Sequence, residues 1–182
     1  PHGESAALIE KIPTSVKIVD LGADFRLEDA AQWEKYYGGT YAGSWQYGLP
    51  ELLNIEAKSN RISNPGCYAT AIALAAAPAV QNSLIAQEDI VVVAASGTTG
   101  AGRNAKINLI ASEVMNSLTS YKFGGIHQHT PEIEETLSKI SENPNVKISF
   151  TPILAPMPRG ILATVTAKLN KNISQLEISK IY

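Results

Sequence analysis

Apolar residues recur along the chain with two different periods, one typical of helices and one typical of strands. In the first part, short β-branched runs at 16–22 and 61–63 predict strands, and helical spacing predicts helices at 4–12 and 27–38. The segment 38–54 is rich in glycine and aromatic residues and predicts a long ordered loop. Helices and strands that alternate in this way indicate an α/β fold.

The second part begins with an alanine-rich helix, predicted from about Cys67 to Val80. The continuous apolar run at 89–96 predicts a strand covered on both faces of its sheet. Helical signals return at 104–118 after a glycine-rich turn. Two further strands are predicted on either side of "APMPRG", at about 146–154 and 160–168.

Composition and charge exclude several classes of partner. The chain has 182 residues, is 45% hydrophobic and carries a formal net charge of -2, which does not favour nucleic acid. Its longest apolar run, 69–80, is shorter than the roughly 18 residues of a membrane span and is interrupted by Thr70. We therefore expect neither a nucleic-acid nor a membrane partner.

The single cysteine cannot form an internal disulfide, which fits a reducing compartment, and we expect a cytoplasmic protein. The chain opens on "PHGESA" and ends inside a periodic segment, "QLEISKIY". We interpret it as an internal piece of a longer protein.

That cysteine, Cys67, lies at the predicted mouth of the alanine-rich helix, directly after Asn64-Pro65-Gly66. Free backbone N–H groups and the helix dipole favour an anion at such a position. Cysteine pKa values fall there from ~8.5 into the ~3.5–7.5 range, and the thiolate is the nucleophile. The alternative is a small buried packing residue.

Two of the three histidines, His127 and His129, lie in "GGIHQHTPE" and provide a candidate base for the thiol. A metal site is the rival interpretation, but the segment lacks a complete ligand set, so no metal is predicted. A structural role for His129 at a helix start also stays open. The helix is expected over 129–140, with Thr130 as its N-cap and Pro131 at its first position.

Two further segments have ligand-binding character. The loop "SGTTGAGR" at 96–103 follows a buried strand and can expose backbone N–H groups, although it lacks the G-x-G-x-x-G spacing. Arg26 follows the strand that ends at Gly22, where it provides a cation for phosphate. Local positive field near an anionic ligand is expected from four side chains, Arg26, Arg103, Lys122 and Arg159.

Seven segments together resemble one enzyme family, N-acetyl-gamma-glutamyl-phosphate reductase, which is related to aspartate-semialdehyde and glyceraldehyde-phosphate dehydrogenases. They follow the family's order and cover nearly the whole chain: "PHGESA", "DLGADFRL", "YGLPEL", "NPGCYATA", "SGTTGAGR", "HQHTPEI" and "PRGILAT". The resemblance implies the end of a Rossmann-type NADP-binding domain at 1–63, followed by an incomplete glyceraldehyde-phosphate-dehydrogenase-like α/β substrate domain at 64–182.

The resemblance also implies roles for individual residues. Cys67 matches the nucleophile and His127 the general acid/base; Arg26 matches a group that holds the acyl phosphate, and Tyr121 lies where it can orient the substrate. Arg159 falls in a family segment without an assigned role. The segments that the resemblance places at the cofactor comprise Pro1, His2 and Gly3; Asn64, Pro65 and Gly66; and Ser96, Gly97, Gly100 and Gly102.

The implied reaction is the NADPH-dependent reduction of N-acetyl-gamma-glutamyl phosphate to the semialdehyde through a cysteine thioester, in arginine biosynthesis, by a homodimer or homotetramer. This chain has Ala69 where the family usually has proline, and no glycine-rich phosphate-binding turn precedes Pro1, so we expect the chain alone to bind NADPH poorly. Two alternatives stay open: a Cys–His hydrolase or acyltransferase without nicotinamide, and a non-catalytic assembly module with the apolar strands and the aromatic loop 41–47 at its interface.

Overall fold

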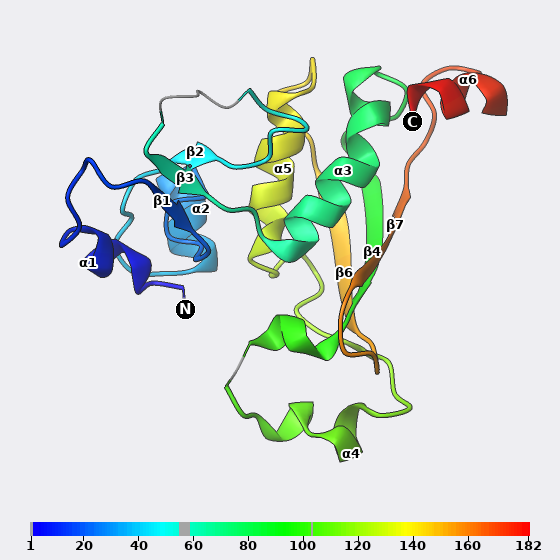
Figure 1. The fold of residues 1–182 in the computed structure, drawn as a ribbon. Coiled ribbons are helices and arrows are strands. Elements are labelled where there is room, and N and C mark those ends of the chain that lie inside the picture. Colours follow the sequence, from blue (N-terminus) through cyan, green and yellow to red (C-terminus); the bar gives the residue numbers. More distant parts are fainter. Residues whose placement is uncertain (1, 55–58, 103) are drawn as a thin grey trace.

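Two β-sheets built from successive parts of the chain organise the computed structural model, which describes residues 2–54, 59–102 and 104–182 (Figure 1). The first sheet has the order β1-β3-β2 and is parallel throughout. Its strands are β1 (Ile18–Asp20), β2 (Gln46–Tyr47) and β3 (Arg61–Ser63). The strands predicted at 16–22 and 61–63 are confirmed, whereas β2 lies inside the segment predicted as loop.

Two short helices accompany this sheet. They are α1 (Ser5–Ile9) and α2 (Ala30–Tyr36), both shorter than the sequence pattern predicted. The Asp29 side chain caps α2 by accepting the N–H groups of Ala31 and Gln32. Trp33 on α2 packs with Ala23 and Leu27 in a small cluster separate from the main core.

The second sheet has the order β5-β6-β4-β7 and is mixed, because β4 is parallel to β6 but antiparallel to β7. The short β5 is antiparallel to β6 at its edge. The strands are β4 (Ile90–Ser96), β5 (Thr119–Ser120), β6 (Ile148–Leu154) and β7 (Ile161–Thr166).

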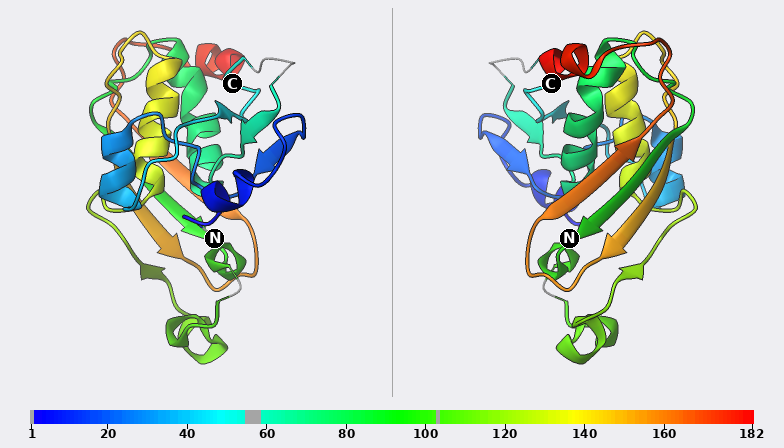
Figure 2. Two further views of the ribbon diagram at one scale, coloured as in Figure 1. Left: turned by 90° about the vertical axis from the view of Figure 1, so that its left-hand side faces the viewer. Right: turned by 90° about the vertical axis from the view of Figure 1, so that its right-hand side faces the viewer.

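Helices α3 (Cys67–Gln81) and α5 (His129–Lys139) lie side by side on one face of this sheet (Figures 1 and 2). The main core forms between them and the sheet, where Ile72, Ile133 and Phe150 are almost completely buried. The other face, turned toward the viewer on the right of Figure 2, has no helix over it among the described residues. Val91 and Val93 are exposed there, so the prediction that this strand is covered on both faces is wrong for the single chain.

The start of α5 differs from its prediction. The N-cap is Gln128, without a side-chain cap, and the helix begins at His129. Thr130 therefore lies inside the first turn, with its hydroxyl buried and without a partner in the described structure. Pro131 occupies the third helical position, where the N–H would have no intrahelical acceptor, so proline is tolerated.

The segment between β4 and α5 extends away from the rest of the fold at the bottom of Figure 1. The helical signals at 104–118 correspond to only one turn each of η2 (Ile107–Leu109) and α4 (Ala111–Val114). The glycine-rich turn contains η1 (Thr98–Ala101). The chain closes with α6 (Gln175–Ile181), which begins with a capping box between Ser174 and Glu177.

Candidate functional site

A cavity of about 770 Å³ lies where the two parts of the chain meet. It is lined by residues from the first part of the chain, from the start of α3 and from the segment 97–128 between β4 and α5, which includes the loop before α5. Nine of the predicted site residues are among them: His2, Arg26, Gly66, Cys67, Ser96, Gly97, Gly100, Tyr121 and His127.

The remaining predicted site residues that the structure describes do not line this cavity. Asn64 and Pro65 belong to the turn that leads into Cys67 (residues 64–66, called the cysteine turn), and the Asn64 carbonyl accepts a hydrogen bond from Arg26 Nε at 2.7 Å. The Gly3 N–H donates to Asp24 at 2.6 Å, and Gly102 lines a smaller neighbouring cavity. Pro1 and Arg103 lie outside the described residues.

Cys67 is the first residue of α3, as the sequence predicted, and Gly66 is the N-cap. The backbone of Gly66 (φ -67°, ψ 152°) is available to any residue, so its conformation does not require glycine. The space does, because a Cβ atom at this position would lie 2.5 Å from His129 Nε2 and 2.9 Å from Glu132 Oε2. The cysteine turn is therefore packed directly against the first turn of α5.

The pKa of the Cys67 thiol is raised, in contrast to the lowered value that the helix terminus predicted. Removal of water from the thiol is the largest cause, although the residue as a whole is exposed at the cavity. The N–H groups of Tyr68 and Cys67 and the charge of Arg26 act in the opposite direction and are outweighed. The raised pKa makes Cys67 a neutral thiol at neutral pH.

His127 and His129 lie together beside Tyr68, with ring centroids of the two histidines 4.9 Å apart. Burial lowers the pKa of both to about 3, and their mutual repulsion adds to the effect for His127. His127 Nδ1 accepts the backbone N–H of His129 at 3.0 Å, which places the single proton of the neutral ring on Nε2. His127 can therefore donate a proton from Nε2.

These two histidines predict a loss of stability in acid. Each has a pKa of about 3 in the folded chain and 6.5 as the ordinary value, so the unfolded chain binds protons that the folded chain cannot. The free energy of unfolding should fall as the pH drops from about 6.5 toward 3, by up to about 1.4 kcal/mol per pH unit and histidine. His127→Gln, whose oxygen can still accept the His129 N–H, should make this decline shallower. Urea unfolding at several pH values measures it, and equal slopes in both proteins would contradict the prediction.

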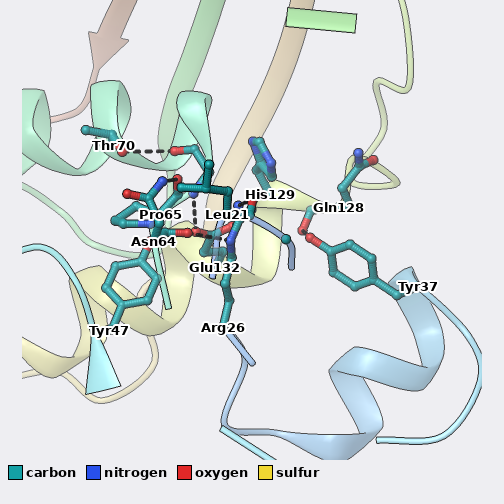
Figure 3. A network of polar contacts seen from close by, with 12 residues as sticks. Leu21, Arg26, Tyr37, Tyr47, Asn64, Pro65, Thr70, Gln128, His129 and Glu132 are labelled. Carbon is teal, nitrogen blue, oxygen red and sulfur yellow. Dashed lines mark hydrogen bonds and ion pairs between the residues drawn. The ribbon is translucent and has the colours of Figure 1, made fainter. Parts of the chain in front are cut away.

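Arg26 is almost completely buried, and two of its three nitrogens are held by the protein. Nε donates to the Asn64 carbonyl and Nη2 to the Leu21 carbonyl at 3.1 Å. Nη1 lies 3.5 Å from Glu132 Oε2 and has no hydrogen-bond acceptor among the described residues. Figure 3 shows Arg26 below the cysteine turn, with Glu132 between them. Both N–H groups of Nη1 and one of the two on Nη2 thus lack a hydrogen-bond acceptor among the described residues.

Tyr121 and Lys122, from the segment between β4 and α5, also line the cavity. The Tyr121 hydroxyl donates to the Tyr68 hydroxyl at 3.0 Å, so the predicted substrate residue is linked to the residue that follows the cysteine. Lys122 has a left-handed backbone (φ 45°), and its ammonium group donates to Gln128 at 2.7 Å. Lys122 supplies positive charge at the cavity, whereas Arg159 packs its backbone against Gly97 and does not line it.

Sequence reasoning did not identify Glu132, Tyr47 or Tyr68 as parts of the site. Glu132 is one helical turn after His129, and residues three apart on a helix share a face, so this spacing was the available signal. The contact from Tyr47 to Glu132 joins residues 85 positions apart and had no signal in the sequence.

Within the described residues, no three His, Cys, Asp or Glu side chains are placed to hold a metal ion. The same part of the chain contains no helix long and apolar enough to span a bilayer.

Comparison with known proteins gives consistent results. Residues 67–182 match the family described as "Semialdehyde dehydrogenase, dimerisation domain". A protein of Acidothermus cellulolyticus named N-acetyl-gamma-glutamyl-phosphate reductase is 61% identical over 171 residues, which cover 92% of this chain and 50% of the relative. A protein of Streptomyces coelicolor with the same name is 52% identical over 185 residues, covering 100% and 54%. The chain thus spans about half the length of the curated relatives it matches.

Two solved structures show the same fold at low sequence identity. Aspartate semialdehyde dehydrogenase II of Vibrio cholerae, complexed with ASA, has a TM-score of 0.69 at 17% identity, covering 100% of this chain and 57% of the other. Aspartate semialdehyde dehydrogenase of Candida albicans with NADP has a TM-score of 0.57 at 11% identity, covering 100% and 53%.

Proposed function

Since the chain belongs to the semialdehyde dehydrogenase family, we propose that it provides the catalytic cysteine of an NADPH-dependent reductase. The substrate is N-acetyl-gamma-glutamyl phosphate, and the products are the semialdehyde and phosphate, in arginine biosynthesis. The names of the relatives at 61% and 52% identity support this substrate. The observation that carries the proposal is the arrangement of Cys67, His127 and the buried Arg26 around one cavity.

In this reaction, the Cys67 sulfur attacks the γ-acyl carbon of the substrate. The bond from that carbon to the phosphate oxygen breaks, the leaving phosphate takes the electron pair and the thiol proton, and a thioester remains. Arg26 Nη1 binds the acyl phosphate, a role supported by its burial without a hydrogen-bond acceptor among the described residues. Tyr121, which lines the cavity, orients the substrate.

The residues around Cys67 fit the nicotinamide end of a cofactor. His2, Ser96, Gly97 and Gly100 share the cavity with the thiol, and the loop containing the last three can approach a ligand closely. When bound, NADPH supplies the hydride that reduces the thioester carbon. The backbone N–H groups at the start of α3 stabilise the oxygen that gains negative charge. His127 donates its Nε2 proton to that oxygen and takes it back as the carbon–sulfur bond breaks, which releases the aldehyde and leaves Cys67 as the thiolate.

We also propose that the chain divides near residue 63 into the end of a Rossmann-type cofactor domain (1–63) and a catalytic domain (64–182). The parallel order β1-β3-β2 and the separate cluster around Trp33 support this boundary. A cytoplasmic location remains a prediction that rests on the single cysteine and the biosynthetic reaction.

The reverse reaction tests the proposed function. The protein at its natural length should reduce NADP when given N-acetyl-glutamate semialdehyde, and the rate should depend on inorganic phosphate. Absorbance of NADPH measures the rate, with arsenate as a second acceptor. Consumption of the acyl phosphate without any dependence on NADPH would instead identify a hydrolase or acyltransferase.

We propose a homo-oligomer in which the open face of the second sheet packs on a second copy. The match to a dimerisation domain supports this, as do the exposed apolar residues Val91, Val93 and Leu162 on that face. Leu162→Lys should dissociate the oligomer, because it would bury an unpaired charge at the interface. Leu176→Lys on α6, where the leucine is almost equally exposed (69% against 70%), should not. Light scattering after size exclusion measures the mass, and an unchanged oligomer for Leu162→Lys would contradict the proposal.

A further inference from the structure

The cysteine turn is held by a carboxylate from another helix. Glu132 on α5 is buried, with its side chain 1% exposed. Its Oε1 accepts two hydrogen bonds of 2.7 Å, one from the backbone N–H of Gly66 and one from the Tyr47 hydroxyl. Its Oε2 faces Arg26 Nη1 at 3.5 Å. Figure 3 shows this carboxylate between Tyr47, Arg26 and the turn that leads into α3.

Helix α3 lacks the usual groups for this task. In a capping box, the side chain at the third helical position reaches back to the N–H of the N-cap residue. Here the N-cap is Gly66, which has no side chain, and the third helical residue is Ala69, which has no polar group. Glu132 therefore replaces the missing partner from outside the helix.

The contacts fix both peptide units that flank Gly66. Its carbonyl accepts the backbone N–H and the hydroxyl of Thr70, at 2.9 and 3.0 Å, and its N–H is held by Glu132. One residue earlier, Arg26 holds the Asn64 carbonyl. The orientation of the Cys67 backbone, and with it the position of the thiol and of the N–H groups that face it, depends on these contacts.

We propose that Glu132 is a positioning residue, which sets the geometry of Cys67 by accepting the Gly66 N–H and by holding Arg26 beside the cavity. This rests on the proposed function only as far as turnover is concerned, because the geometry of the thiol can be measured without substrate. Glu132 does not line the cavity, so it acts through the turn.

Three substitutions separate the hydrogen bond from the charge. Glu132→Gln removes the charge but keeps an oxygen that can accept the Gly66 N–H. Glu132→Ala removes both, and Glu132→Asp keeps the charge but withdraws the oxygens by one methylene. In the protein at its natural length, we expect kcat to fall about 100-fold for Ala and Asp, because small misplacements of a reacting group have effects of this size. Gln should retain kcat within about tenfold.

Alkylation by iodoacetamide, without substrate or cofactor, provides the independent measurement. The N–H groups of Tyr68 and Cys67 favour the thiolate, so loss of the turn geometry should move the pH midpoint of alkylation upward. We expect a higher midpoint for Ala than for Gln, since both lack the charge and only Ala lacks the acceptor. Thermal melts establish which variants fold, and if Ala does not fold, Asp against the wild-type protein makes the same comparison, since both keep the charge and only Asp withdraws the acceptor.

Glu135→Ala is the matched control. Glu135 lies on the same helix and accepts the backbone N–H groups of Glu28 and Asp29 at 3.2 and 3.4 Å, away from the cavity. It should lower thermal stability and leave kcat and alkylation unchanged. The proposal is wrong if Ala matches Gln, and Asp matches the wild-type protein, in kcat and in alkylation midpoint. If the wild-type protein reduces no acyl phosphate but the alkylation midpoints differ as expected, the proposed reaction fails and the positioning role stands.

Discussion

Cys67→Ser should lower the rate of NADPH-dependent reduction about 10⁴-fold or more, with the protein still folded. The hydroxyl is a much weaker nucleophile than sulfur, and an ester is a poorer hydride acceptor than a thioester. The substitution is nearly isosteric at a residue that is exposed to the cavity, so packing should change little. Steady-state NADPH oxidation measures the loss.

Two controls accompany this substitution. Circular dichroism and thermal unfolding of Cys67→Ser should match the wild-type protein. In the wild type, iodoacetamide should abolish activity and the acyl phosphate should protect against it, because alkylated Cys67 cannot attack the substrate. Activity of the serine variant within about tenfold of wild type would exclude a covalent cysteine mechanism.

Gly66→Ala should lower both activity and stability. The added Cβ would lie 2.5 Å from His129 Nε2, 2.7 Å from its Cε1 and 2.9 Å from Glu132 Oε2, and both side chains are buried. Because neither neighbour has free space, α5 and the cysteine turn must move apart. We expect a loss of about 1–3 kcal/mol in the free energy of unfolding and about 100-fold in kcat.

Gly48→Ala is the control for this prediction. Its Cβ would also be too close to a neighbour, at 2.8 Å from Ile62 Cγ2, but Gly48 does not line the cavity. Urea unfolding and kcat are measured for both variants. Gly48→Ala should lose stability and keep kcat, and a similar kcat for the two variants would show that the close packing at Gly66 has no catalytic significance.

Local patterns predicted the elements whose residues decide their own conformation. The strand at 61–63 and the first residue of the helix at Cys67 are confirmed, because β-branched residues and an Asn-Pro-Gly break act within a few positions of the chain. The signals at 104–118 failed. Isolated helices of this length are marginal in water, and this segment, with Ile107 and Leu118 exposed, has little core to pack against.

The electrostatics of the site could not be predicted from sequence in the same way. The position of Cys67 at a helix start was predicted, yet its pKa depends on how much water the surrounding walls exclude, and those walls come from segments distant in sequence. The pKa of His127 and His129 likewise reflects burial against Tyr68 and against each other. Sequence spacing contains no information on desolvation.

The sequence alone determined that a single cysteine opens a helix after a rigid turn, and its motifs indicated the family that the comparisons then established. Only the tertiary structure decided what holds that cysteine in place. The carboxylate of Glu132 replaces the cap that Gly66 and Ala69 cannot provide, and it can do so because α5 packs beside α3. A contact between residues 66 positions apart depends on how the two helices meet, which no local pattern specifies.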